Sequence, residues 1–178
     1  LGGIAIMTST KHERASDRCA EALEIIEKSN NTKYDIVVMV QGDEPMVHPQ
    51  MIVESVQPLI NDNSVQITNL LGEIKSRDEF ENKNCIKVVC DKNLNAIYFS
   101  REPIPTRKKG ADHVPMRKQI CVIAFRRDYL LKFNRMPETP LEKIESVDMM
   151  RVIESGDKVK MVMTNGESYG VDTKEDLT

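Results

Sequence analysis

The sequence predicts an α/β protein with a mainly parallel mixed sheet, helices between the strands and an inserted β-hairpin region. Strand-like and helix-like stretches alternate along most of the 178 residues, which favours a single domain. The apolar run Ile36 to Val40 is typical of a strand buried on both faces at the centre of a parallel sheet. The strand-like segments 86–90 and 95–99 are separated by Asp91-Lys92-Asn93-Leu94, which has the length and chemistry of a hairpin connection.

The composition excludes several classes of protein. Twenty-five basic and 28 acidic side chains leave a net charge of −3, with no overall bias toward nucleic acid or anionic lipid. The four cysteines form no Cys-x-x-Cys motif and the three histidines are widely separated, so we expect reduced thiols and no zinc cluster. No apolar segment reaches the roughly 18 residues of a membrane span, and the start lacks signal-peptide features. These observations favour a cytoplasmic protein without a membrane partner.

In the N-terminal third, a strand is expected at Ile4 to Met7, followed by a polar loop. Ser16 is then a good N-cap for a helix, because its hydroxyl can accept a hydrogen bond from the first turn, and an apolar stripe carries this helix to about Lys28. After the strand at 36–40, helical spacing continues from Pro49 to Ile60.

The same patterns predict the rest of the chain. The helix that starts at Thr139-Pro140-Leu141-Glu142 begins with a capping box and is expected to continue to a stop at Gly156. The other expected elements are a strand at 65–71, a short helix at 75–81, a strand at 119–125, a helix at 127–133, a strand at 159–163 and a final helix capped by Thr173.

The strand at 36–40 ends in polar chemistry. Gly42 permits a sharp turn, Asp43 and Glu44 place carboxylates beyond the strand, and Pro45 ends its pairing. In open α/β sheets this edge is where ligands bind. An acidic turn that caps the next helix explains the same residues, but the downstream motifs favour a ligand site.

Three further features have both a structural and a functional interpretation. Arg18, in the first turn of its helix, is a surface cation or a contact to a phosphate or base. Asp148 lies among apolar helix positions, where it forms an ion pair with Arg151 or contacts a ligand. The basic loop that contains Arg107 and Lys108 is solvated, or it closes over an anionic ligand.

Four motifs occur in order: Val40-Gln41-Gly42-Asp43-Glu44-Pro45-Met46; Ile97-Tyr98-Phe99-Ser100-Arg101 with Ile104-Pro105; Pro140-Leu141-Glu142 with Ile144-Glu145 and Arg151-Val152; and Gly170-Val171-Asp172-Thr173 with Glu175-Asp176-Leu177. Together they resemble the 3-deoxy-manno-octulosonate cytidylyltransferases, or CMP-Kdo synthetases. The resemblance implies a cytoplasmic, homodimeric enzyme of the nucleotide-diphospho-sugar transferase fold. It would couple CTP to an acidic eight-carbon sugar for lipopolysaccharide biosynthesis.

The resemblance also implies roles for individual residues. Asp43 and Asp172 match the catalytic, magnesium-binding aspartates of the family, although Asp172 by itself is also explained as a turn residue. Gln41 and Arg101 match contacts to the sugar acid. Arg18 matches an arginine of the nucleotide-contacting loop, in which Ser16 also lies.

The chemistry of the reaction fits these roles. A triphosphate and a sugar carboxylate repel one another, so the site needs Mg²⁺ to neutralise phosphate charge and to activate the attacking hydroxyl. Arg101 can bind a carboxylate through its fork of N–H groups. No side chain stands out as a dedicated general base.

Departures from the family pattern concern the sugar side. Gln119 stands where the family usually has a sugar-contacting histidine, and Asp148-Met149 stands where it has Glu-Gln. The activated sugar is therefore Kdo or a close relative, for instance the 8-amino sugar, whose ammonium group would seek an acceptor such as Asp148. Arg14-Ala15-Ser16 replaces a Ser-Gly-Thr loop.

The family's first βα unit and its phosphate-gripping loop have no counterpart after Leu1, so we expect an N-terminally truncated piece of the family's domain. Two alternatives stay open. One is a cytidylyltransferase for another acidic sugar such as a sialic acid, and the other is an inactive remnant or interaction module.

Overall fold

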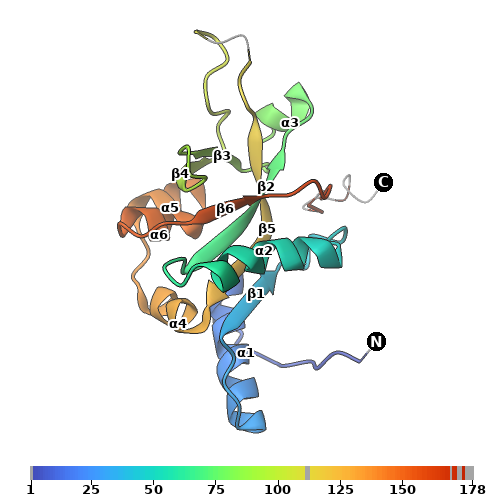
Figure 1. The fold of residues 1–178 in the computed structure, drawn as a ribbon, viewed down its shortest axis with the longest axis vertical. Coiled ribbons are helices and arrows are strands. Elements are labelled where there is room, and N and C mark those ends of the chain that lie inside the picture. The colour runs from blue at the N-terminus through green and yellow to red at the C-terminus, as the bar shows by residue number, and fades with distance from the viewer. Residues whose placement is uncertain (1, 111–112, 169, 172–173, 175–178) are drawn as a thin grey trace.

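The computed structural model describes residues 2–110, 113–168, 170–171 and 174 (Figure 1). The elements in chain order are α1 (Ala15–Asn30), β1 (Ile36–Val40), α2 (Pro49–Asn61), β2 (Ile67–Glu73), α3 (Arg77–Glu81), β3 (Lys87–Cys90), β4 (Ala96–Ser100), β5 (Arg117–Arg126), α4 (Arg127–Arg135), α5 (Pro140–Glu145), α6 (Met149–Glu154) and β6 (Lys160–Met163).

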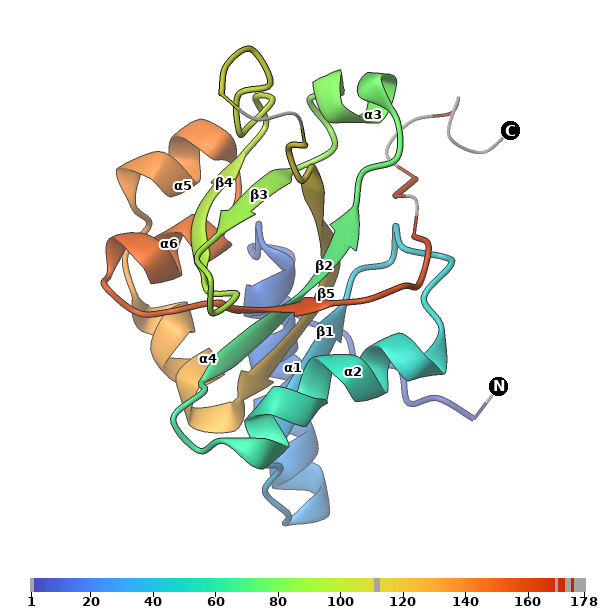
Figure 2. The ribbon, with the colours of Figure 1, turned by 45° about the horizontal axis from the view of Figure 1, so that its top comes forward.

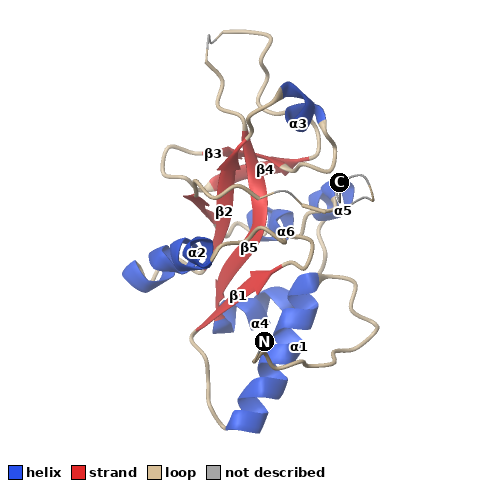
Figure 3. Cartoon of the chain, turned by 90° about the vertical axis from the view of Figure 1, so that its right-hand side faces the viewer, coloured by secondary structure: helices blue, strands red, loops and turns tan. Residues whose placement is uncertain are grey.

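One mixed sheet forms the centre of the fold. Its strand order is β4-β3-β5-β2-β6, and β1 pairs with β5. Helix α2 covers one face, while α1, α4, α5 and α6 lie on the other (Figure 3). The larger core cluster, which includes Phe125 and Phe133, lies on the face of α1 and α4, and a smaller cluster forms around Met51 of α2.

The mixed sheet is confirmed, but the expectation that it is mainly parallel is wrong. Among the described strands, only β2 and β6 pair in parallel, whereas β5 runs antiparallel to β1, β2 and β3, and β3 runs antiparallel to β4. Strand β5, which has ten residues, lies between β1 and β2 and runs antiparallel to both. β1 and β2 therefore run in the same direction but do not pair with each other.

The expected central position of β1 is also wrong. Within the described chain β1 pairs only with β5, and Val40 at its end is 41% exposed. Its apolar run is explained by α1 and α2, which contact it from opposite faces. An apolar run therefore indicates that both faces of a strand are covered, and not that both of its edges are paired. The buried central strands are β2 and β5.

Two other expectations are corrected. Residues 2–9 form no strand, and Ile4 and Met7 are 78% and 90% exposed. The helix expected over 139–156 is two helices, because Ser146 adopts a left-handed conformation with φ of 52° that ends α5. Gly156, with φ of 81°, follows the end of α6 as expected.

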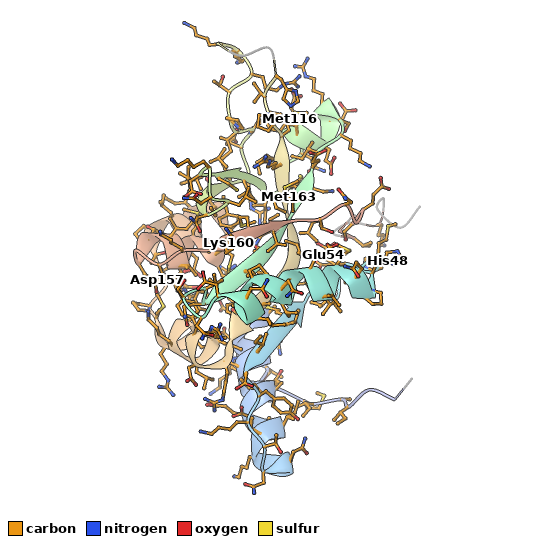
Figure 4. The ribbon with its side chains drawn as sticks, in the orientation of Figure 1. His48, Glu54, Met116, Asp157, Lys160 and Met163 are labelled. Carbon is orange, nitrogen blue, oxygen red and sulfur yellow. The ribbon has the colours of Figure 1, made fainter. Side chains whose placement is uncertain are left out.

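The hairpin of β3 and β4 is confirmed, with Val88 opposite Phe99. Lys160 of β6, labelled in Figure 4, donates a hydrogen bond to the carbonyl of Asn93 in the hairpin turn at 2.6 Å. This contact connects the last strand to the hairpin. The final helix expected after Thr173 lies outside the described residues. In the part of the chain that is described, no helix is both long enough and apolar enough to cross a membrane.

Candidate active site

A cavity of about 950 Å³ opens where two strands separate along one edge of β5. The pairing of β1 ends at Val40 opposite Val122, and β3 meets β5 at Lys87 opposite Lys118. The segment of β5 between these pairs, residues 119–121, forms the floor of the cavity. The walls come from the turn after β1, the start of α1, residues 82–86, Arg101, residues 146–148 and the chain after β6.

The turn after β1 contributes to this cavity a carboxylate with one unpartnered oxygen. The side chain of Asp43 lines it, and Asp43 Oδ1 is buried without a hydrogen-bond partner among the described residues. The backbone carbonyl of Asp43 accepts a hydrogen bond from the N–H of Val171 at 2.9 Å. Asp172, which follows directly in the sequence, lies outside the described residues. Gln41 lines the same cavity.

Ser16 and Asp148 meet at the wall formed by α1 and α6. Ser16 is not the expected N-cap, because Arg14 occupies that position and Ser16 is buried in the first turn. Its hydroxyl instead donates to Asp148 Oδ2 at 3.2 Å. The expected ion pair of Asp148 with Arg151 is also wrong, because the Arg151 guanidinium pairs with Glu142 at 2.5 Å.

Burial raises the pKa of the Asp148 carboxyl above its ordinary value, and the hydrogen bond from Ser16 and the charge of Arg14 offset part of this effect. The folded protein therefore holds this proton more tightly than the unfolded chain does. Stability from this group should fall as pH rises from the ordinary value of 3.8 through the raised pKa.

We expect Asp148→Asn to remove the loss of folding stability that the Asp148 carboxyl causes as pH rises. The melting temperature of the variant relative to the wild type should increase as pH rises, and the difference should be smallest below pH 3.8. Thermal denaturation of both proteins across the acidic range measures it. A difference that is constant or shrinks with rising pH would contradict the assignment.

Two arginines that line the cavity are held by backbone carbonyls. Arg18 donates to the carbonyls of Ser9 and His12 at 3.1 and 2.9 Å, so it fixes the loop before α1. Arg101 donates from Nε to the carbonyl of Glu145 at 2.7 Å and from Nη1 to that of Lys83 at 3.0 Å. Both therefore contribute positive charge at a fixed position.

Gln119 on the cavity floor is oriented from below. Its Nε2 donates to Asn69 Oδ1 at 2.6 Å, and the fully buried Asn69 donates in turn to the carbonyl of Ile120 at 2.7 Å. The side chain of Gln119 is thus held in the cavity by the neighbouring strand β2.

Comparison with known proteins decides the family. The Cytidylyltransferase family profile matches residues 1–162. Two 3-deoxy-manno-octulosonate cytidylyltransferases, from Geobacter metallireducens and Geotalea uraniireducens, are 41% and 42% identical to the chain, over 99% of it and 71% and 72% of their own lengths. The chain belongs to the 3-deoxy-manno-octulosonate cytidylyltransferase family. The solved structure of a CMP:2-keto-3-deoxy-manno-octonic acid synthetase complexed with CTP is 32% identical, covers 99% of this chain and 70% of its own, and superposes with a TM-score of 0.86, which confirms the fold class.

Most of the predicted site residues line this one cavity, but three of them do not, and Asp172 lies outside the described residues. Arg107 and Lys108 lie on an exposed loop outside its lining. The side chain of Ser16 points toward the wall residue Asp148, behind the lining.

Sequence reasoning missed Lys118 and Glu79 at the cavity, and it did not predict the hydrogen bond that Glu44 makes. Lys118 of β5 forms an ion pair with Glu79 at 2.5 Å, and both side chains are largely buried. Glu44 accepts a hydrogen bond from the N–H of Cys121 at 3.0 Å. Lys118 stands in a polar run between Arg117 and Gln119, so no local pattern distinguishes it from a surface lysine or indicates its distant partner.

Among the described residues, the unpartnered oxygen of Asp43 is the atom that fits a divalent ion. No group of three or more His, Cys, Asp or Glu side chains able to hold a metal occurs in the described part of the chain. A site for Mg²⁺ there would be completed by phosphate oxygens, water and a further carboxylate. Burial raises the pKa of Cys85, which also lines the cavity, to about 11, so it is a neutral thiol rather than an activated nucleophile.

Proposed function

We propose that this protein transfers a cytidylyl group from CTP to the anomeric hydroxyl of 3-deoxy-manno-octulosonate, giving the CMP-sugar and pyrophosphate for lipopolysaccharide biosynthesis. The observation that carries the proposal is the buried, unpartnered oxygen of Asp43 in a cavity that Arg18 and Arg101 also line. The cavity volume of about 950 Å³ lies near the upper end of the range for small-molecule sites, which suits two substrates bound side by side.

In this reaction the sugar hydroxyl oxygen attacks the α-phosphorus of CTP. The new O–P bond forms, the bond from the α-phosphorus to the bridging oxygen breaks, and pyrophosphate leaves with that electron pair. The hydroxyl proton passes to solvent, because no described side chain is placed as a dedicated base. Catalysis then depends on charge and alignment, as expected for phosphoryl transfer.

Asp43, with Asp172, would hold Mg²⁺, which when bound neutralises phosphate charge and lowers the pKa of the attacking hydroxyl. The cationic side chains of Arg18 and Arg101 attract the two anionic substrates into the cavity. Gln41, Gln119 and Asp148 supply polar contacts to the sugar acid, and Ser16 orients Asp148. We assign Arg107 and Lys108 to the approach of anions, since their loop lies outside the cavity lining.

We further propose that the protein acts in the cytoplasm as a homodimer, as the resemblance implies. Ile97 of β4, the last strand in the order on that side of the sheet, is 55% exposed, and this apolar side chain supports a contact between two copies. Light scattering should give twice the chain mass, and a mass of one chain would reject the dimer.

Release of pyrophosphate tests the function. With CTP and Mg²⁺, we expect release that requires 3-deoxy-manno-octulosonate or its 8-amino analogue, and none after the metal is chelated. Preference for the 8-amino sugar would assign Asp148 to its ammonium group, and preference for the 8-hydroxy sugar would reject that assignment. Activity only with a sialic acid, or with no sugar, would contradict the proposed function.

A further inference from the structure

The two adjacent carboxylates of the turn after β1 have different surroundings. Asp43 has a buried oxygen with no partner among the described residues. Both oxygens of Glu44, in contrast, are engaged by the protein, since Oε1 accepts from the N–H of Cys121 at 3.0 Å and Oε2 accepts from the hydroxyl of Ser168. Of the two residues, only Asp43 therefore has a buried carboxylate oxygen without a protein partner among the described residues.

Glu44 acts at the gap between β1 and β3 along β5. The N–H of Gln41 donates to the carbonyl of Cys121 at 3.3 Å, and the N–H of Gln119 donates to the carbonyl of Ile86 at 2.9 Å. Between these two backbone contacts, the carboxylate of Glu44 receives the N–H of Cys121. A side chain thus continues the hydrogen bonding of β5 across the gap and fixes the turn.

Ser168 anchors the chain that leaves β6. It is 3% exposed, and its carbonyl accepts a hydrogen bond from Lys118 Nζ at 2.9 Å. Three residues later, the N–H of Val171 donates to the carbonyl of Asp43 at 2.9 Å. Figure 2 shows this segment running from β6 to the turn between β1 and α2.

We propose that Glu44 and Ser168 are a positioning pair, which holds the segment leading to Asp172 against the backbone of Asp43. The pair itself binds no metal. This inference rests on the proposed function, in which Asp43 and Asp172 share one ion. The pair fixes the chain at Ser168 and thereby holds Val171, the residue before the second proposed ligand, at the turn that carries Asp43.

The alternative is that Glu44 is itself a ligand, and Glu44→Gln separates the two roles. Its amide oxygen can still accept from Cys121, and its NH₂ group can donate to the Ser168 hydroxyl, which is also an acceptor. The charge that a hard divalent cation requires is lost. A positioning role therefore tolerates Glu44→Gln, whereas a ligand role does not.

The experiment measures amide exchange by NMR and Mn²⁺ binding in the presence of CTP by calorimetry, on the same proteins. Ser168→Ala should accelerate exchange of the Val171 amide and weaken Mn²⁺ binding roughly tenfold to a hundredfold, the usual effect of losing a supporting residue behind a metal ligand. Glu44→Gln should retain most of the binding. Ser168→Ala combined with Glu44→Ala should lose little more than either change alone.

Ser64→Ala is the matched control, because it also deletes a hydrogen bond from a serine hydroxyl to a carboxylate, but at an exposed site. In the wild type, Ser64 Oγ donates to Asp62 Oδ1 at 2.7 Å. It should leave both measurements unchanged. Equal melting temperatures of Ser168→Ala and Ser64→Ala show that the fold is intact. If Glu44→Ala fails to fold, Ser168→Ala and Glu44→Gln still decide the question.

Unchanged exchange at Val171 in Ser168→Ala would overturn the inference, as would a loss of Mn²⁺ binding in Glu44→Gln as large as that caused by Asp43→Asn. If the wild-type protein releases no pyrophosphate while Ser168→Ala still accelerates exchange of the Val171 amide, the proposed function is rejected. The same result would support the positioning of the segment.

Discussion

Asp43→Asn should lower kcat by roughly a thousandfold, which corresponds to about 4 kcal/mol of lost transition-state stabilisation. The substitution keeps the shape of the side chain but removes the negative charge from the one cavity oxygen that is buried and unpartnered in the described structure. Steady-state pyrophosphate release at saturating CTP and sugar measures this loss. Raising the Mg²⁺ concentration should restore little activity.

Asp35→Asn is the control for this variant. Asp35 is exposed directly before β1, and its backbone carbonyl accepts a hydrogen bond from the N–H of Arg127 at 2.9 Å, while its side chain makes no hydrogen bond or ion pair with the described residues. Both variants therefore lose one carboxylate charge, at the two ends of the same strand. Near-normal activity of Asp43→Asn would rule out its catalytic role.

Arg151→Met should destabilise the fold by about 3–5 kcal/mol, because it leaves a buried carboxylate without its partner. The Arg151 guanidinium binds both oxygens of Glu142, at 2.5 and 2.7 Å, and the two side chains are 5% and 0% exposed. The guanidinium also lies 4.6 Å from the ring centroid of Phe133. Urea denaturation followed by circular dichroism measures the free energy of unfolding.

Two further variants test the cause of this loss. Replacing both members of the pair, Arg151→Met with Glu142→Leu, should recover much of the stability, because the uncompensated charge is removed. Arg77→Met removes an exposed pair with Glu81 at 2.8 Å and should have little effect. A loss in Arg151→Met no larger than that in Arg77→Met would contradict the importance of the buried pair.

Sequence reasoning succeeded where the signal is local. The turn after β1, the hairpin of β3 and β4, and the start of α5 each depend on a few consecutive residues, and the structure has all three. The family followed from four short motifs in order, and Asp43, Gln41 and Arg101 do line one cavity.

The errors concern partners that lie far apart in the chain. Nothing near Ser16 reveals that its hydroxyl bonds to Asp148 rather than capping a helix. Glu142, Asp148 and Arg151 all fall within one stretch of helical spacing, so the sequence does not show which of the two acids pairs with Arg151. The same spacing gives no sign of the left-handed Ser146 that divides this stretch into two helices. The apolar composition of β1 likewise could not show that helices cover its faces while, among the described strands, it pairs with β5 alone.

The central claim is that a divalent ion joins CTP to Asp43 at the mouth of the cavity. Crystals grown with CTP and Mn²⁺, measured at the manganese absorption edge, locate such an ion directly. An anomalous peak is expected within about 2.1 Å of Asp43 Oδ1, with phosphate oxygens among the other ligands of the ion. CTP bound with its metal elsewhere, and Asp43 Oδ1 still without a partner, would contradict it.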